Sequence, residues 1–188
     1  MQKIVYWSAA ELTSKTELAI KRAEKEKGRT VLIDFKEFIP DIYRYYGLEY
    51  KSKTELIAMY EGGQSDISQF LNKKNSMYVF TGFDKYEYMK FTPEHLAYII
   101  SVLDFDMAVF DVNAGIYFTD TYVALKYADE INVVMEPDNL SYYINAEMIK
   151  FVCDNWKIDK AKMTGLIAGK HADVDSAKEI TGIKVKKV

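Results

Sequence analysis

Short apolar runs alternate along this chain with segments whose apolar residues recur at helical spacing. The runs are typical of buried strands, and they lie at residues 2–8, 30–34, 75–81, 107–111, 130–135, 163–168 and 183–185. The intervening segments predict helices at residues 11–25, 41–46, 54–60, 65–71, 92–103, 119–128, 140–156 and 174–180. Strands that are each followed by a helix form a mostly parallel sheet. We therefore predict an α/β fold, a doubly wound, mostly parallel sheet with helices on both faces.

Polar residues follow several of these apolar runs directly. Residues 8–16 follow the first run, Asp34 closes the second, and Asp111 closes the run at residues 107–111. In an open parallel sheet, ligands bind at the carboxyl ends of the strands, near the point where the strand order reverses. We therefore expect a binding site, if there is one, to contain these residues.

Length, composition and charge narrow the class of protein. The 188 residues, with 49% hydrophobic and 28% charged side chains, fit one globular domain spanning residues 1–188. A net charge of -3 gives no reason to expect direct binding to nucleic acid. The single cysteine fits a reducing compartment, and no run is long enough for a membrane span or patterned as a signal peptide. We therefore expect a cytoplasmic protein, and two histidines with one cysteine argue against a His/Cys metal site.

The opening stretch carries the most specific chemistry. An apolar strand leads through a short loop into a helix whose first turn holds Lys15 and Thr16. A phosphate-binding loop places a Lys-Thr pair there, because the free N–H groups of a helix N-terminus favour an anion. Such a loop also needs glycines, which let the backbone approach phosphate closely. The segment between Ser8 and Lys15 contains none.

The order of the elements and their end residues resemble the ParA/MinD group of P-loop ATPases over nearly the whole chain. Besides Lys15-Thr16, the resemblance rests on the segments 30–34 and 42–48, which are similar to the first switch region. Residues 105–116 resemble the Walker B strand and second switch, and residues 127–137 resemble the next helix end and strand, including Pro137. An unrelated doubly wound sheet is the alternative, although a dinucleotide-binding domain would need a G-x-G-x-x-G motif that this chain lacks.

This resemblance implies roles for particular residues. Ser14, Lys15, Thr16 and Pro137 would contact a nucleotide, Thr16 and Asp111 would bind Mg²⁺, and Asp34 would be catalytic by orienting water. Each residue also has a structural interpretation. Lys15 would then be an exposed first-turn lysine, Thr16 would bond within the helix terminus, and the aspartates would cap the following helices.

The chain departs from the family pattern where the chemistry is most demanding. Ala10 to Ser14 stand where Lys-Gly-Gly-x-Gly is expected, so Ala10 replaces the signature lysine and all three glycines are lost. Glu11 adds a carboxylate beside the space for a polyphosphate, a like-charge contact worth about 4 kcal/mol near a protein surface. Lys36 stands where a second aspartate often follows Asp34. We therefore expect weak or no ATP binding.

A tyrosine-rich segment follows the second strand. Tyr43, Tyr45 and Tyr46 lie within one short helix, which is more tyrosine than one helix face buries, and tyrosine is favoured at interfaces. This segment predicts contact with a protein partner.

The sequence thus favours a degenerate ParA/MinD-like protein that requires no cofactor and acts as a scaffold or regulatory protein in a positioning, partition or assembly system. The alternative is a slow Mg-ATP-dependent ATPase that uses Lys15, Thr16, Asp34 and Asp111 and is switched by forming a homodimer. A third hypothesis is that the site holds another anion or small molecule.

Overall fold

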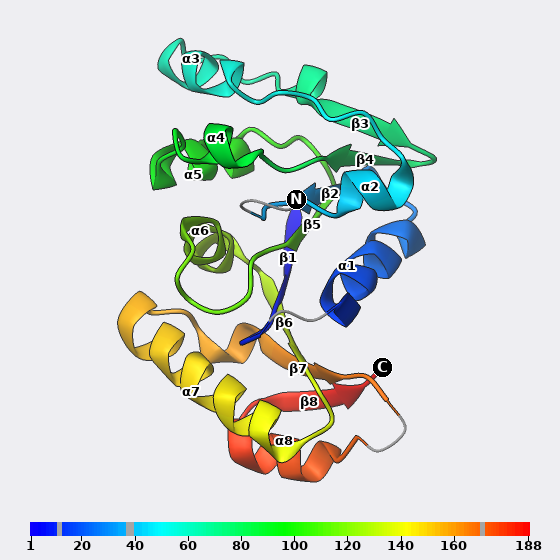
Figure 1. Ribbon diagram of the computed structural model, residues 1–188, viewed down its shortest axis with the longest axis vertical. Coiled ribbons are helices and arrows are strands. Elements are labelled where there is room, and N and C mark those ends of the chain that lie inside the picture. Colours follow the sequence, from blue (N-terminus) through cyan, green and yellow to red (C-terminus); the bar gives the residue numbers. More distant parts are fainter. Residues whose placement is uncertain (11–12, 37–39, 170–171) are drawn as a thin grey trace.

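The strands form one continuous eight-stranded sheet in the order β3-β4-β2-β5-β1-β6-β7-β8 (Figure 1). The computed structural model describes residues 1–10, 13–36, 40–169 and 172–188, and of Thr13 only the backbone. All neighbouring strands are parallel except β3 and β4. The strands are β1 Gln2–Trp7, β2 Thr30–Asp34, β3 Leu71–Lys74, β4 Met77–Phe80, β5 Met107–Asp111, β6 Glu130–Met135, β7 Met163–Ile167 and β8 Lys184–Lys187.

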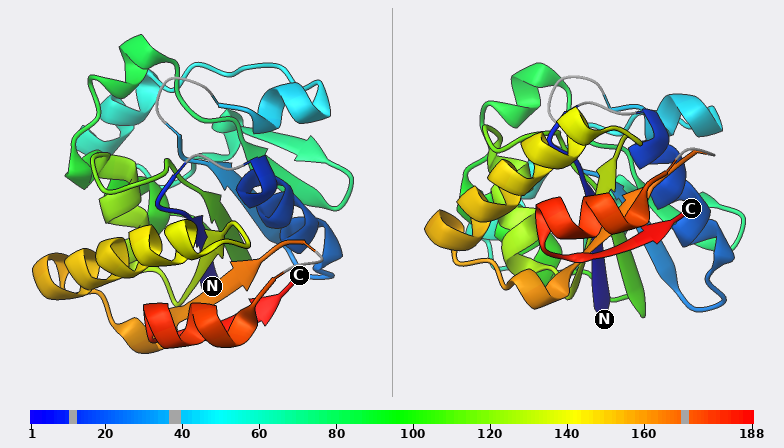
Figure 2. Two further views of the ribbon diagram at one scale, coloured as in Figure 1. Left: turned by 60° about the horizontal axis from the view of Figure 1, so that its bottom comes forward. Right: turned by 90° about the horizontal axis from the view of Figure 1, so that it is seen from below.

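Helices cover both faces of the sheet, which confirms the predicted α/β class (Figures 1 and 2). One face packs against α1 and α2, and the other against α3, α5, α6, α7 and α8. The helices are α1 Thr13–Lys25, α2 Ile42–Tyr46, α3 Glu55–Glu61, α4 Lys85–Tyr88, α5 Pro93–Ser101, α6 Thr119–Tyr127, α7 Asn139–Trp156 and α8 Val174–Thr181, with 3-10 turns at Ser68–Phe70 and Lys160–Lys162.

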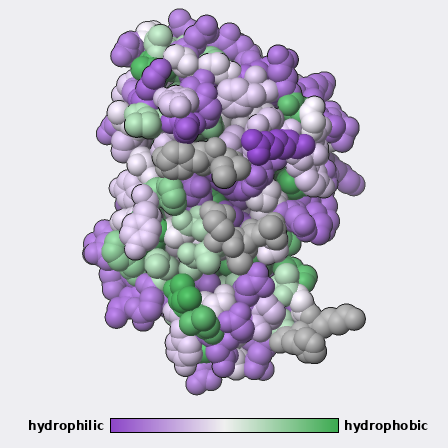
Figure 3. All heavy atoms as spheres, viewed as in Figure 1, coloured by the Kyte–Doolittle hydropathy of each residue, from purple (hydrophilic) through white to green (hydrophobic). Residues whose placement is uncertain are grey.

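Alternate residues of the central strands enter two separate cores. In β1, Val5 and Trp7 pack toward the α5–α7 side, whereas Ile4 and Tyr6 pack toward α1. The strands are buried on both faces because helices cover both, which explains why they read as continuous apolar runs. Figure 3 shows a largely hydrophilic surface on which hydrophobic residues gather over the lower part, where α7 lies.

One local prediction was wrong, and two elements were not predicted. Residues 65–71 form no α-helix: only the turn Ser68–Phe70 is helical, and strand β3 begins at Leu71. β3 is an antiparallel edge strand with a polar sequence, so it lacks the apolar run by which the other strands were predicted. The short helix α4, capped by Asp84, was also not predicted. None of the helices in the described ranges is long and apolar enough to cross a membrane.

Candidate functional site

The ends of β2, β5 and β1 bring the predicted site residues together. β5 lies between β2 and β1, and Asp34 is the register partner of Asp111. Helix α1, the next element after β1, begins at Thr13 and carries Ser14, Lys15 and Thr16 in its first turn. The site therefore forms at the carboxyl edge of the sheet, as the sequence predicts.

Lys15 is fully buried, so its interpretation as an exposed first-turn lysine was wrong. Its ammonium donates a hydrogen bond to the carbonyl oxygen of Val112 and lies 3.5 Å from Oδ1 of Asp111. That oxygen of Asp111 is buried and accepts no hydrogen bond from any described residue. The Lys15 side chain is thus turned inward onto β5 and its following loop.

Lys36 completes the charge arrangement at Asp111. Its ammonium lies 2.9 Å from Oδ2 of Asp111 and donates hydrogen bonds of 2.9 Å to the hydroxyl of Thr16 and to Oδ2 of Asp41. The Thr16 hydroxyl in turn donates to Oδ2 of Asp111 at 2.7 Å. Burial alone would lower the pKa of Lys36, but the carboxylates of Asp111 and Asp34 outweigh it and hold that pKa above its ordinary value. The ammonium is therefore charged at neutral pH.

Asp34 is enclosed in the same cluster and supports the chain that follows β2. Its Oδ2 accepts the N–H of Ile42 at 3.0 Å, and its Oδ1 accepts the N–H of Lys36 at 3.4 Å. Burial raises the pKa of Asp34 from 3.8 to about 7; Lys36 opposes this rise and Asp111 adds to it. The contact with Ile42, the first residue of α2, matches the capping interpretation of this aspartate.

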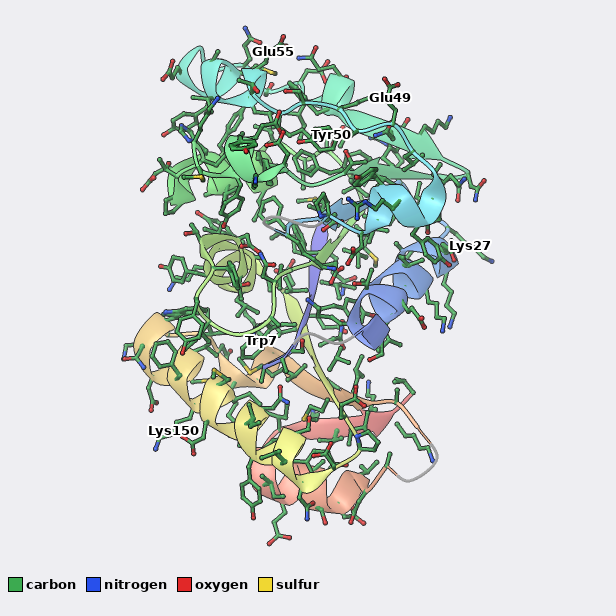
Figure 4. All side chains as sticks on the ribbon, in the orientation of Figure 1. Trp7, Lys27, Glu49, Tyr50, Glu55 and Lys150 are labelled. Carbon is green, nitrogen blue, oxygen red and sulfur yellow. The ribbon has the colours of Figure 1, made fainter. Side chains whose placement is uncertain are left out.

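The loop after β5, which the resemblance matches to a second switch, is tied to both neighbouring elements. The indole N–H of Trp7, at the end of β1 (Figure 4), donates to the carbonyl of Gly115 at 2.7 Å, and the N–H of Gly115 donates to the carbonyl of Ser8 at 2.8 Å. On the other side, Asn113 donates its backbone N–H and its side-chain amide to the buried carboxylate of Asp120 in α6. Hydrogen bonds to β1 and the following Ser8 on one side, and to α6 on the other, therefore hold this loop.

Pro137 lies in the loop between β6 and α7. The loops after β1 and β6 border a cavity of about 150 Å³, which Ala9, Ala10, Glu136 and Asp138 line together with residues of α7. Ligand pockets for small molecules usually measure about 300–1,000 Å³. This cavity is too small for a nucleotide, and the two acidic residues at its rim disfavour phosphate.

The tyrosine-rich helix α2 makes mainly internal contacts. The ring of Tyr43 packs edge-on against Tyr50, and the hydroxyl of Tyr46 donates to Glu24 of α1 at 2.7 Å. Tyr45 is exposed and stacks edge-on against Tyr46. Only Tyr45 therefore presents most of its side chain to a partner.

Sequence reasoning missed two members of the cluster. Lys36 was noted only as a departure from the family pattern, and Asp41 only as the start of a helix. The available signal was Lys36, which stands two residues after the strand end at Asp34 where the family pattern has an acid. Asp41 follows it five residues later. Glu11, the carboxylate expected to repel phosphate, lies outside the described residues, and so does Leu12.

No family model and no curated protein matches the sequence. Solved structures do match: a ParA family ATPase from Chlorobium tepidum has a TM-score of 0.81 at 13% identity, covering 99% of this chain and 82% of that one. This chain has the ParA/MinD fold.

Two further structures of this fold match the chain over nearly its whole length. For a chain of the MinC:MinD cell division complex of Aquifex aeolicus, the TM-score is 0.73 at 18% identity, with coverage of 98% and 79%. For MinD of Pyrococcus horikoshii, complexed with Mg-ADP, the TM-score is 0.72 at 14% identity, with coverage of 98% and 79%. At these identities the likeness establishes the fold alone, so the chemistry must be argued from this chain's own residues.

Proposed function

We propose that this protein is a ParA/MinD-fold scaffold or regulatory protein of a positioning, partition or assembly system, and that it works without ATP. One observation carries the proposal: the ammonium of Lys36 lies 2.9 Å from both Oδ2 of Asp111 and the hydroxyl of Thr16. Thr16 and Asp111 are the residues that the resemblance assigns to Mg²⁺. An internal cation already joins them.

A magnesium ion does not fit the site with these partners. A dication between Thr16 and Asp111 would stand about 3–4 Å from the Lys36 ammonium, and its repulsion there is about 8 kcal/mol near a protein surface. Mg²⁺ also needs oxygen ligands at about 2.0–2.1 Å in octahedral geometry. We therefore infer that Lys36 does structurally what a metal ion would do, by neutralising Asp111 and fixing Thr16.

The phosphate side of the site points the same way. Lys15, the residue that would reach a phosphate, donates instead to the carbonyl of Val112 and is fully buried. Ala10 supplies no second cation, and the segment before Lys15 contains no glycine that would let its N–H groups wrap around a phosphate. A triphosphate would thus meet few donors and would have to displace an existing ion pair.

The tied loop after β5 gives the scaffold a physical basis. A nucleotide switch needs a loop with two arrangements that the ligand biases. Here Gly115 is hydrogen-bonded to Trp7 and Ser8, and Asn113 to Asp120, so protein contacts on both sides favour one arrangement of the loop. A surface held in one arrangement suits a constant binding partner, which is the role we propose.

The second candidate is the slow Mg-ATP-dependent ATPase. It is favoured by the meeting of Thr16, Asp34 and Asp111 at one edge of the sheet, the arrangement that such chemistry uses. It requires Lys36 to leave Asp111 when nucleotide binds.

Titration with Mg·ATP, followed by calorimetry and thermal unfolding, separates the two. A ligand present at 1,000 times its Kd stabilises a protein by about 4 kcal/mol. We expect millimolar Mg·ATP to leave the melting temperature and the heat of mixing of the wild type unchanged. In Lys36→Asp, which removes the internal cation and adds an acid, we expect Mg²⁺ alone to raise the melting temperature, because the oxygen ligands are then free.

Lys73→Asp is the matched control, since Lys73 is an exposed lysine on the edge strand β3. It should show no effect of Mg²⁺ or Mg·ATP. A Mg-dependent stabilisation of the wild type by ATP that Thr16→Val abolishes would contradict the proposal and support the ATPase.

A further inference from the structure

Helix α7 has apolar residues on two opposite sides. Tyr142, Ile149 and Val152 face the sheet and are buried. A second set recurs at positions i, i+3, i+4 and i+11 and is exposed; this outer stripe consists of Leu140, Tyr143, Ile144 and Phe151, with the partly buried Met148 beside it. A helix that is apolar on both sides is normally covered on both. The outer stripe is therefore a surface that needs a partner.

The two halves of the outer stripe differ in shape. The N-terminal half carries protruding side chains, since Leu140 is 70% and Tyr143 is 61% exposed. The C-terminal half borders a cavity of about 350 Å³, lined by Ile116, Met148 and Phe151 with the polar residues Glu147, Lys150, Asp154 and Asn155. Protruding groups at one end and a hollow at the other can interlock if two copies of the helix lie side by side in opposite directions.

Charge selects the same orientation. Glu147 and Lys150 lie near the middle of α7, both are exposed, and neither makes an ion pair with any described residue. Figure 4 shows Lys150 on the outer side of α7, pointing away from the sheet. Two antiparallel copies related by a two-fold axis level with residues 148–149 would bring Glu147 of each beside Lys150 of the other. Parallel copies would instead place like charges together, which is unfavourable.

The same axis brings the shapes into register. Residues rise about 1.5 Å each along a helix, so in this arrangement Tyr143 of one copy comes level with Asp154 of the other, over its cavity. The contact is isologous: each copy offers the same protruding half and the same hollow. Both the charge pattern and the shape of this face are thus complementary to themselves.

We propose that this protein forms a homodimer through the outer stripe of α7, packed antiparallel against the α7 of a second copy, without nucleotide. Glu147 and Lys150 fix the direction of the pair, and Tyr143 anchors it in the hollow beside Phe151. This surface lies outside the lysine–aspartate cluster, so the dimer proposal can be wrong without affecting the proposed function, and the reverse also holds.

Sedimentation velocity on the full chain, in nucleotide-free buffer and over a range of protein concentrations, tests whether this dimer forms. We expect the wild type to change from monomer to dimer as concentration rises. Glu147→Lys and Lys150→Glu, each of which places two like-charge pairs across the contact, should each weaken the dimer about tenfold or more. The double reversal E147K/K150E restores opposite charges and should return the dissociation constant to within about threefold of the wild type.

Tyr143→Ser should also weaken the dimer about tenfold or more, as expected for a buried anchor. Tyr86→Ser is the control, because Tyr86 is an equally exposed tyrosine on α4 outside the stripe, and it should leave association unchanged. Circular dichroism verifies that every variant is folded. A wild type that stays monomeric at all concentrations would overturn the proposal, and so would a double reversal that fails to restore the dimer or a Tyr143→Ser variant that dimerises normally.

Discussion

At the scale of single residues, burial shifts the pKa values of two ionisable side chains, Lys53 and Asp34, toward neutral pH. Lys53 is fully buried, and its ammonium lies 4.3 Å from the centre of the Tyr50 ring and donates a hydrogen bond to the hydroxyl of Thr81 at 3.1 Å. Burial lowers the pKa of Lys53 from 10.5 to about 7, although Glu87 and Asp34 oppose that change. Burial raises the pKa of Asp34 from 3.8 to about 7. The two groups therefore give the free energy of unfolding opposite dependences on pH.

We predict that the free energy of unfolding has a minimum near pH 7. Between pH 3.8 and about 7, folded Asp34 keeps a proton that the unfolded chain has released, so stability falls as pH rises. Between about 7 and 10.5, the unfolded chain keeps a proton on Lys53 that the folded protein has lost, so stability rises with pH. Each group contributes a slope of at most about 1.4 kcal/mol per pH unit. Urea unfolding at a series of pH values between about 4 and 9.5 measures this pH dependence of the free energy of unfolding.

Two variants test which residue causes the falling part of this pH profile and which causes the rising part. Asp34→Asn should remove the falling limb, because the amide does not titrate while its oxygen can still accept the N–H of Ile42. Lys53→Met should remove the rising limb. A profile that is unchanged in both variants would show that other groups cause the pH dependence.

At the scale of elements, the turn after β4 positions the chain that carries the cluster. Gly82 has a φ of +72°, and a Cβ there would lie 2.6 Å from Cβ of Pro40 and 3.0 Å from the carbonyl oxygen of Asp34. Gly82 thus lets Asp34 and Pro40 come close to the chain after β4, and Pro40 is followed directly by Asp41, which accepts a hydrogen bond from Lys36.

We predict that Gly82→Ala destabilises the protein by about 3 kcal/mol or more. The positive φ costs about 1–2 kcal/mol, and the clash with Pro40 adds to it. Gly63→Ala is the matched comparison, since Gly63 has a φ of +65° but nothing within 4 Å of its Cβ position. It should cost only about 1 kcal/mol in urea unfolding at pH 7. Equal losses for the two variants would mean that the close approach to Pro40 carries no energy.

At the scale of the whole molecule, one sheet joins every strand from β3 at one edge to β8 at the other. The apolar core on the α5–α7 side is continuous from Leu71 to Ile183. No boundary in the sheet separates the first half of the chain from the second. That residues 1–188 form a single domain stays a prediction, and the continuous sheet is the reason to test it.

We therefore predict that the chain unfolds in one cooperative transition. Trp156→Phe leaves Trp7, at the centre of the sheet, as the sole tryptophan. Its fluorescence and the far-ultraviolet circular dichroism of the same variant should then follow the same urea curve. Because dimerisation would shift the midpoint with concentration, both signals must be recorded at one protein concentration. Separated transitions would divide the chain into more than one folding unit.

The sequence by itself determined the alternation of strands and helices. Buried parallel strands need apolar runs, and the helices that cover them need apolar faces. Short runs such as Thr30–Asp34 and Met107–Asp111 are therefore enough to predict the strands. It also determined that Thr16, Asp34 and Asp111 would meet, because parallel strands end at one edge. The edge strand Leu71–Lys74 escaped prediction, since a strand with a solvated face needs no apolar run.

Only the tertiary structure decided where the charges point. Lys15 and Lys36 are long, flexible side chains whose positions in the sequence do not fix the direction of their ammonium groups. Folding turns both onto Asp111, because a buried carboxylate is costly until a cation neutralises it. The outward stripe of α7 was likewise visible only once the sheet had covered the opposite side of that helix. Element identity depends on neighbours in sequence, whereas ion pairs and exposed faces depend on neighbours in space.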